Sequence, residues 1–324
     1  GSVLFAMAES FMGLFVGRAL IGLGVAACLM ASFKAYVMWF PKDRLPFVNG
    51  CQMAAGGLGA LGATVPIEML LSITDWRGIF FGLAALTVVS ALFVLLAVPE
   101  KRKNATGETL RRQCEDFLRV LKSPPFLRLA PLTVTVQSTF ISVQSLWSGP
   151  WLYDIAGLGR GAVAEYLFAI AAGMVAGFLT LGTAAANLGR FGIKPIAVML
   201  SGVIVFMAVQ GLIVLQWREA ILIQWIAFGF FGTTSILSYA ILSQAFPSDL
   251  AGRVNAGLNL LLFSAIFFVQ WGIGAVIDLW PATQEGRYAP AGYQASFGMM
   301  LGLQCAALGW FCLYRRARFD IAPS

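Results

Sequence analysis

Long apolar runs separated by short polar intervals make up most of this sequence. A helix needs about 20 mostly apolar residues to cross the hydrocarbon layer of a membrane. After the end of an incomplete span at 1–8, runs of this length predict spanning helices near residues 11–40, 47–72, 78–98, 130–153, 163–186, 194–216, 220–246, 254–278 and 294–314. The pattern therefore predicts an all-α integral membrane protein.

The longest polar interval, residues 99–129, divides the spans into two groups. Residues 108–122 inside it carry apolar side chains at helical spacing, which predicts an amphipathic helix along the membrane surface. The expected organisation is a partial amino-terminal bundle at 1–99, a cytoplasmic inter-bundle loop with the amphipathic helix at 100–123, a six-helix bundle at 124–318 and a cytoplasmic tail at 319–324.

The composition supports lipid as the main surroundings of the chain. Apolar residues make up 59% of it, charged residues only 11%, and the mean hydropathy is +0.81. A soluble domain usually carries about 25% charged residues. The formal charge of +7 is spread between the apolar runs and does not gather on one face, so nucleic acid is not an expected partner.

Basic residues also orient the spans. Most of the 22 Lys and Arg residues flank one set of span ends, which includes the interval 99–129 and the segment after residue 314. Cytoplasmic loops of membrane proteins carry an excess of Lys and Arg. We therefore expect a multi-pass protein of the plasma (inner) membrane with a cytoplasmic C-terminus.

The side chains on which much enzyme and metal chemistry depends are missing. The chain has no His, and its five Cys show no CxxC spacing, which excludes an imidazole proton relay and an ordinary zinc site. No GxxxxGK[ST] segment that could bind ATP occurs. We expect no metal, no cofactor and no enzymatic activity.

One short phrase occurs twice along the chain. Phe, Pro, Asp, Val and Asn follow one another with the same spacing from Phe40 to Asn49 and from Phe246 to Asn255. Internal duplication of a helix bundle is typical of transporters. When the two copies are aligned, two helices and most of a third in the second half have no counterpart in the first, so we expect the amino-terminal bundle to lack them.

Three segments resemble motifs of the major facilitator superfamily. Residues 17–26 (GRALIGLGVA) are similar to its RxxxGxGxA pattern in the fourth helix, and residues 76–80 (WRGIF) to the opening of its sixth helix. Residues 181–192 (LGTAAANLGRFG) resemble a degraded copy of its loop between helices eight and nine, with Ala186 in place of an Asp. The resemblance implies two six-helix bundles, here without helices 1–2 and most of helix 3, and a monomer.

Two charged residues at membrane depth are coupling candidates. The resemblance implies a role for Arg18 in proton coupling, in which the permanently charged guanidinium biases a neighbouring acid. Alternatively, Arg18 reaches the outer interface near Glu9. Glu68 is either a protonatable coupling group or the ion-pair partner of Arg77 or Arg18.

Other polar side chains on the spans are candidates for the substrate pathway. Lys34 either attracts an anionic substrate or extends to the cytoplasmic interface, and Trp147 either lines the pathway or anchors the outer interface. The amide and hydroxyl groups either face the pathway or form interhelical hydrogen bonds. The candidates are Lys34, Asn49, Gln52, Gln137, Gln144, Trp147, Tyr239, Asn255 and Asn259.

Charged residues of the cytoplasmic loops are candidates for an inner gate. Asp43 and Asp249 occupy matched positions of the repeat, and Arg190 and Arg253 lie near loops on the same side. Salt bridges between such residues would hold the inner side shut in one state and break in the other. The alternative is that these are solvated loop charges.

Together, these patterns predict a secondary active transporter that moves a small polar or anionic organic solute by alternating access, coupled to protons. The expected partners are the solute, H⁺ and the lipid bilayer. The span at 47–72, which the resemblance makes the family's fifth helix, lacks the Gly-Pro pair of the family's antiporters, which favours uptake by symport. A non-transporting membrane sensor on the same scaffold and an inactive transporter remnant are the alternatives.

Overall fold

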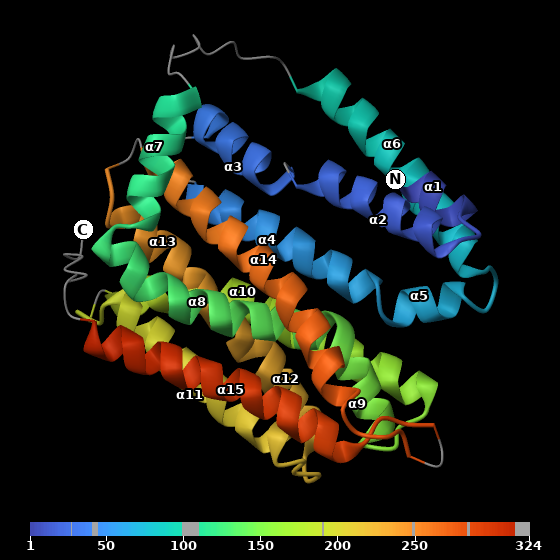
Figure 1. The fold of residues 1–324 in the computed structure, drawn as a ribbon. Coiled ribbons are helices and arrows are strands. Elements are labelled where there is room, and N and C mark those ends of the chain that lie inside the picture. The colour runs from blue at the N-terminus through green and yellow to red at the C-terminus, as the bar shows by residue number, and fades with distance from the viewer. Residues whose placement is uncertain are drawn as a thin grey trace. The chain divides into compact units, whose positions relative to one another are not determined.

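The computed structural model describes residues 1–26, 28–40, 45–98, 110–189, 191–247, 250–283 and 286–314. Every regular element within these ranges is a helix, as the apolar pattern predicts. The helices form two compact units, Gly1–Gln52 with Gly62–Glu108 and Met53–Leu61 with Thr109–Ser324. Figure 1 shows the helices in chain order by colour.

The first unit is held together by aromatic contacts and by capped helix starts. Its helices are α1 (Ser2–Met7), α2 (Phe11–Val25), α3 (Cys28–Trp39), α5 (Val65–Leu70) and α6 (Trp76–Ala97), together with the first part of α4 (Leu45–Gly62). The ring of Phe5 on α1 lies 4.5 Å from that of Phe80 and 5.6 Å from that of Trp76 on α6. At the start of α6, a carboxylate oxygen of Asp75 accepts a hydrogen bond from the backbone N–H of Gly78 at 2.8 Å.

Two of the expected spans are each divided into two helices. The segment 11–40 forms α2 and α3, and the segment 47–72 forms α4 and α5. Pro66 stands in the first turn of α5, where a missing N–H costs no helical hydrogen bond, so a new helix begins there. Nine full spans were expected, whereas seven helices of the described ranges are long and apolar enough to cross a membrane.

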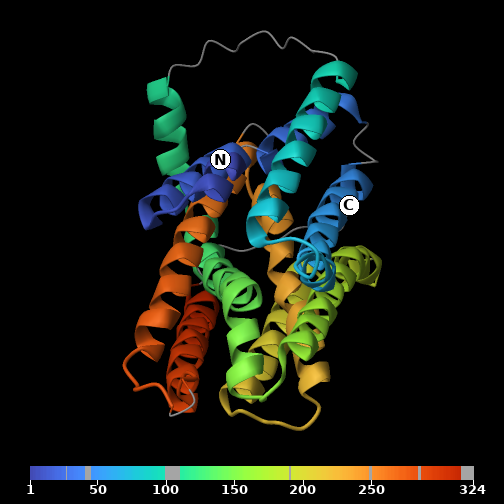
Figure 2. The same cartoon turned by 90° about the vertical axis from the view of Figure 1, so that its right-hand side faces the viewer.

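The second unit contains the other six of these seven spans. Two spans combine shorter helical pieces: α8 (Pro124–Ser142), η2 (Val143–Trp147) and α9 (Ser148–Asp154) in one, and α12 (Ile221–Gly232), η3 (Thr233–Ile236) and α13 (Leu237–Gln244) in the other. The remaining spans are α10 (Arg160–Gly189), α11 (Pro195–Val214), α14 (Ala251–Ile277) and α15 (Pro290–Leu313). Figure 2 shows α8, α10, α14 and α15 extending along a common direction.

Aromatic side chains and a close helix contact form the core of the second unit. Phe140, Phe206 and Phe228 are fully buried, with ring centroids 4.9–6.1 Å apart. Gly229 lets α12 approach α10 closely, because a Cβ atom at this position would lie 2.3 Å from the carbonyl oxygen of Ile170. Small residues at such contacts allow tight packing of membrane helices, for which burial of apolar surface supplies little driving force in lipid.

Another helix of this unit, α7 (Leu110–Leu121), lies in the segment expected to be amphipathic. We expected it to lie along the membrane surface, but it also packs against α14. Val120 is 1% exposed, and a Cβ atom on Gly257 of α14 would lie 3.0 Å from Leu121 and 3.4 Å from Phe117. Leu118 remains exposed. One apolar face of α7 therefore covers protein.

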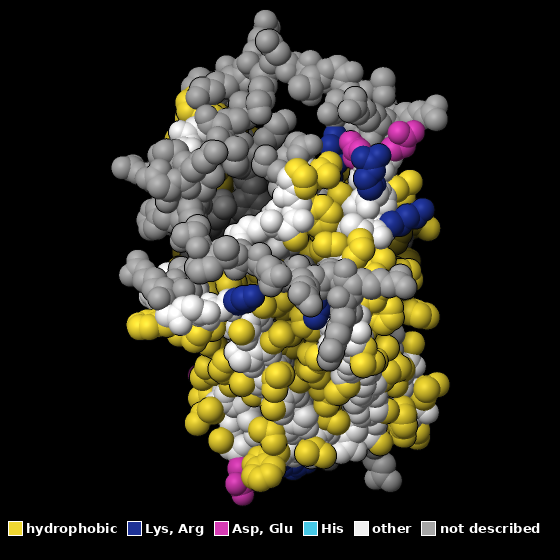
Figure 3. Space-filling model, turned by 90° about the vertical axis from the view of Figure 1, so that its left-hand side faces the viewer, with side chains coloured by type: hydrophobic (Ala, Val, Ile, Leu, Met, Phe, Trp, Pro, Cys, Tyr) yellow, Lys and Arg dark blue, Asp and Glu magenta, His cyan; other side chains and the backbone are white. Residues whose placement is uncertain are grey.

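The surfaces of the spans are strongly apolar. Figure 3 shows hydrophobic side chains over most of the described surface that it draws, with few charged side chains among them. No residue of α6 is buried, and the side chain of Leu96 is 88% exposed. A surface of this kind would drive association in water, whereas lipid chains solvate it directly.

Candidate functional site

Two spans of the second unit change their helical hydrogen bonding in mid-course. In the first, α8 passes through the π-helical turn η2 into α9, and in the other α12 passes through the 3₁₀ turn η3 into α13. Such turns interrupt the regular backbone ladder and frequently occur at functional sites. Four of the expected pathway residues lie in or near these turns: Gln137, Gln144, Trp147 and Tyr239.

Hydroxyl groups from η3 and α13 are hydrogen-bonded to amide side chains of α8 and α14. The three hydroxyls recur every four residues and therefore share one face of the helix. Each donates to an amide oxygen: Ser235 to Gln137, Tyr239 to Asn259, and Ser243 to Asn255, the last at 3.0 Å. We call these six residues the hydroxyl–amide row.

The hydroxyl–amide row extends from the interior of the second unit towards the joint between α13 and α14. Ser235 and Gln137 are buried, at 1% and 6% exposure, whereas the two Asn residues, Tyr239 and Ser243 are half-buried. All six residues lie in helices long and apolar enough to span a membrane. The sequence predicted Gln137, Tyr239, Asn255 and Asn259 as site residues but missed Ser235 and Ser243, whose i, i+4 spacing to Tyr239 was the available signal.

Trp147 lies in the contact between η2 and α14. Its indole N–H donates to the backbone carbonyl of Gln270 at 3.2 Å, and its ring lies 3.1 Å from the position of a Cβ atom on Gly274. The Gln270 amide in turn donates to the Ser145 hydroxyl at 3.0 Å. Gln144 is half-buried in the same turn. The structure thus places Trp147 beside α14, and both Trp147 and Gln144 lie outside the hydroxyl–amide row.

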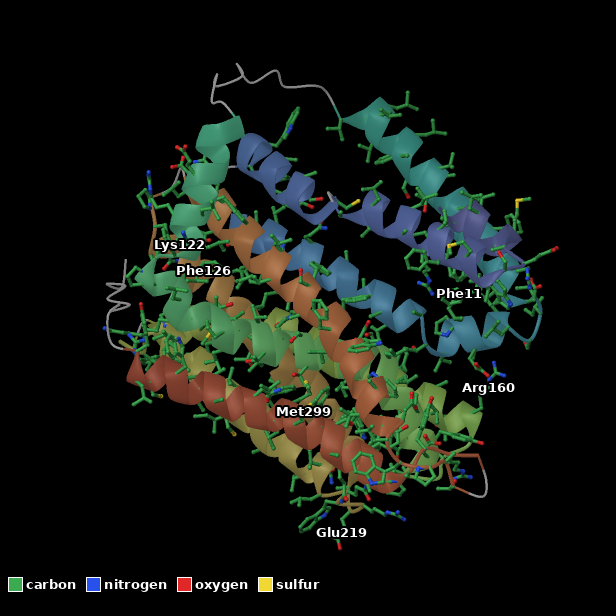
Figure 4. The ribbon with its side chains drawn as sticks, viewed as in Figure 1. Phe11, Lys122, Phe126, Arg160, Glu219 and Met299 are labelled. Atoms are coloured by element: carbon green, nitrogen blue, oxygen red, sulfur yellow. The ribbon has the colours of Figure 1, made fainter. Side chains whose placement is uncertain are left out.

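Charged side chains of the second unit gather at the ends of its spans. In Figure 4, Lys122, Arg160 and Glu219 lie at helix ends or in loops, whereas Met299 lies along the length of α15. At the end where α14 begins, Arg253 forms an ion pair with Asp116 of α7 at 3.3 Å, and Asp116 also contacts Arg119 at 3.2 Å. The sequence singled out Arg253 but missed Asp116, because nothing local indicates that α7 packs against α14.

Three further gate candidates, Asp43, Arg190 and Asp249, lie outside the described residues. The side chains of Lys34 on α3 and Asn49 on α4 are likewise not described. Their expected roles stay predictions.

The first unit brings Arg18 and Gln52 into defined contacts. The Arg18 guanidinium lies over the ring of Phe5, 4.7 Å from its centroid, and 5.6 Å from that of Phe80. Gln52 accepts a hydrogen bond from the hydroxyl of Tyr36 through its amide oxygen. These aromatic neighbours of Arg18 hold the guanidinium without neutralising its charge.

Arg77 and Glu68 of this unit have different surroundings from Arg18. Arg77 donates to the backbone carbonyl of Ala8 at 3.2 Å and lies over the ring of Trp76. Glu68 is half-buried in the first turn of α5, where the amino-terminal end of a helix favours negative charge.

Over the described ranges, no three His, Cys, Asp or Glu side chains are close enough together to hold a metal ion. The groups that the fold gathers inside the spans are hydroxyls and amides. They can bind a polar solute through hydrogen bonds, without forming a covalent bond to it.

Comparisons with known proteins agree with this arrangement. The family model of the Major Facilitator Superfamily matches residues 1–277, which is most of the chain. Among solved structures, the chain is similar to a bacterial homologue of the iron transporter ferroportin, crystallised in an outward-facing state. The TM-score is 0.54 at 14% sequence identity, and the match covers 98% of this chain and 80% of that one. At this identity the likeness shows a shared fold. With its apolar spans and its family match, the chain is a multi-pass membrane transporter and belongs to the major facilitator superfamily.

Proposed function

We propose that this protein is a secondary active transporter that moves a small polar or anionic organic solute by alternating access. Transport is coupled to protons as symport, and the chain lies in the plasma (inner) membrane with its C-terminus in the cytoplasm. The observation that carries the proposal is the hydroxyl–amide row inside the spans of the second unit. Because the chain belongs to a transporter family, we assign the row to solute transport.

The position of the row supports a binding role. Polar groups in the hydrocarbon region are costly unless they are hydrogen-bonded, and they commonly mark solute pathways. Ser235 lies in η3 and Tyr239 lies just after it, where the regular helix is interrupted. Transporters build their solute sites near such interruptions, because backbone and side-chain groups become available to a ligand there.

The ion pair between Asp116 and Arg253 supports a gating role for this end of the unit. Alternating access needs an element with two discrete arrangements. The pair joins α7 to the first turn of α14, the helix that carries two of the amides. The side chains of Arg253 and Asp116 are 21% and 14% exposed, so water can solvate both charges when the pair opens. We therefore add Asp116 to the gate candidates.

Proton coupling rests on the charged groups of the first unit. Arg18 keeps its charge throughout a transport cycle and can favour the ionised form of an acid nearby. Glu68 is the acid we propose for this role, since a half-buried carboxyl group can exchange protons with water in one state and lose that access in another.

The test is a flux assay with the purified protein in liposomes that contain a pH-sensitive dye. Dicarboxylates, sugar phosphates, neutral sugars and amines are added to the outside one at a time, without an imposed pH gradient. A proton symporter acidifies the lumen when its solute enters, and protein-free liposomes give the background. If a radiolabelled solute enters without a change of luminal pH, the coupling is wrong. If no solute enters above background, the transport proposal itself is wrong.

A further inference from the structure

We infer that the hydroxyl–amide row is a site selective for hydrogen-bond acceptors, and that the solute it takes is a small dicarboxylate. This inference rests on the proposed function and deepens it by naming the substrate class. It is carried by the direction of the hydrogen bonds within the row and by the distribution of charge around it.

Every amide of the row has its oxygen engaged. An amide side chain has one oxygen, which accepts, and one NH₂ group, which donates twice. The hydroxyls of Ser235, Tyr239 and Ser243 all donate to the amide oxygens. In the described part of the chain, no group accepts a hydrogen bond from the NH₂ groups of Gln137, Asn255 and Asn259. What the row still offers a ligand is therefore a set of N–H donors.

These donors are not sealed inside the protein. Among the described residues, the buried polar side-chain atoms without a partner lie on Trp151, Gln224, Trp225 and Gln304, and none belongs to the row. Asn255 and Asn259 are half-buried, so their NH₂ groups reach the surface of the α13–α14 pair. An unpaired donor in a membrane costs free energy, and a ligand that carries acceptor groups would offset that cost at the row.

The spacing of the donors indicates the size of the ligand. Asn255 and Asn259 are separated by one helical turn, which is about 6 Å along α14 at a rise of about 1.5 Å per residue. Two acceptor groups at that separation can be held by both amides at once. The outermost carboxylate oxygens of a four-carbon diacid in extended form lie about 6 Å apart, by ordinary C–C and C–O bond lengths.

The charge around the row favours an anion over a cation. The segments α8, η3, α13 and α14 contain no Asp or Glu, so a cationic solute would find no counter-charge on the helices that form the row. At the end of the row, Asp116 of α7 is engaged with Arg253 and Arg119. Hydrogen bonds from N–H groups to a carboxylate are roughly twice as strong as those between neutral partners.

The experiment measures binding to the purified full chain in lipid nanodiscs. Thermal unfolding is followed with three probes of matched length, succinate, 1,4-butanediol and 1,4-butanediamine, at matched ionic strength. We expect succinate to raise Tm and the diamine to have no effect. Asn259→Leu, which is nearly isosteric and lacks the donors, should weaken succinate binding about fivefold to tenfold.

Two hydroxyl variants test the orientation of the amides. In Tyr239→Phe and Ser243→Ala the amide is free to rotate and present its oxygen, so the preference for succinate over the diol should fall about fivefold. Ser201→Ala is the matched control, since Ser201 on α11 is exposed and donates to the carbonyl of Val198 in its own helix. The unliganded Tm and the elution volume of each variant show whether it is folded.

Each outcome of these experiments either supports the inference or overturns it. The inference is overturned if the diol or the diamine binds as well as succinate, if no probe binds, or if both hydroxyl variants keep the selectivity of Ser201→Ala. If succinate binds selectively but no solute crosses liposome membranes, the proposed transport fails while the acceptor-selective site stands. If solutes are transported but this selectivity is absent, the transport proposal stands and the dicarboxylate site is wrong.

Discussion

At the scale of single residues, Arg18 is a charged side chain whose main contacts among the described residues are with aromatic rings and not with an acid. Its guanidinium lies over the rings of Phe5 and Phe80. A cation–π contact at an exposed site contributes about 0.5–1 kcal/mol, so these contacts position the side chain more than they stabilise the fold. The charge itself is what remains available for coupling.

We therefore expect Arg18→Gln to separate coupling from folding. In liposomes with an inward proton gradient, accumulation of solute should be abolished, while exchange of labelled for unlabelled solute at equilibrium continues. The loss of unfolding free energy should be no more than about 1 kcal/mol. Equal loss of accumulation and exchange would assign Arg18 to the structure and not to coupling.

The ion pair between Asp116 and Arg253 makes a second prediction at this scale. Arg253→Gln should lower the free energy of unfolding by about 1 kcal/mol and increase hydrogen exchange in α7, because it removes the charge contact between α7 and α14. Arg119→Gln is the control, since the side chain of Arg119 is 74% exposed and its contact with Asp116 lies within α7. The assignment fails if both variants change α7 protection equally.

At the scale of helices, close contact between α10 and α12 depends on small residues. Gly229 brings its backbone against the carbonyl of Ile170, and Gly173 of α10 lies similarly close to Ile226. Lipid-facing helices gain little from apolar burial, so packing distance contributes much of their association. The span of α12 also carries the three hydroxyls of the row, since α12 leads through η3 into α13.

Gly229→Ala should therefore be destabilising although Ala is the better helix former. Its Cβ would overlap the Ile170 carbonyl, and we expect a cost of about 1–3 kcal/mol. Gly302→Ala on α15 is the matched control, because nothing lies within 4 Å of the added methyl group. Its expected effect is neutral or a gain of up to about 1 kcal/mol. Thermal unfolding of both variants in the same detergent makes the comparison, and equal shifts in Tm would contradict the close contact.

At the scale of the whole molecule, the orientation of the spans in the membrane determines into which compartment the proposed site would release a solute. The basic residues favour a cytoplasmic location for the interval that contains Lys122. The joint between α14 and α15, which contains Thr283, lies at the other end of α14 from Arg253. A solute released at the Arg253 end of the row would then enter the cytoplasm.

Single cysteines test this orientation in a protein whose five native Cys are replaced by Ser. A membrane-impermeant thiol reagent applied to intact cells should label Thr283→Cys. Lys122→Cys should react only after the cells are permeabilised. The reverse pattern would invert the proposed topology and the direction of transport with it.

The sequence by itself determined the class of protein, most of its spans and its family. Hydropathy follows from the residues in each window, because a segment of enough apolar residues partitions into lipid whatever its neighbours are. It also indicated the amides Gln137, Asn255 and Asn259 as polar groups on apolar helices. The division of the span at 47–72 was missed because Pro66 and the glycines before it interrupt an apolar run without changing its hydropathy.

Only the tertiary structure decided which groups meet. Ser235 and Gln137 are 98 residues apart in the chain, and Asp116 and Arg253 lie on helices that no local pattern pairs. These contacts depend on how helices pack and on where η3 turns the hydroxyls, and both are properties of the assembled bundle. The physical reason is that side-chain hydrogen bonds and ion pairs act over a few ångströms, whereas the sequence pattern specifies only which face of each helix is polar.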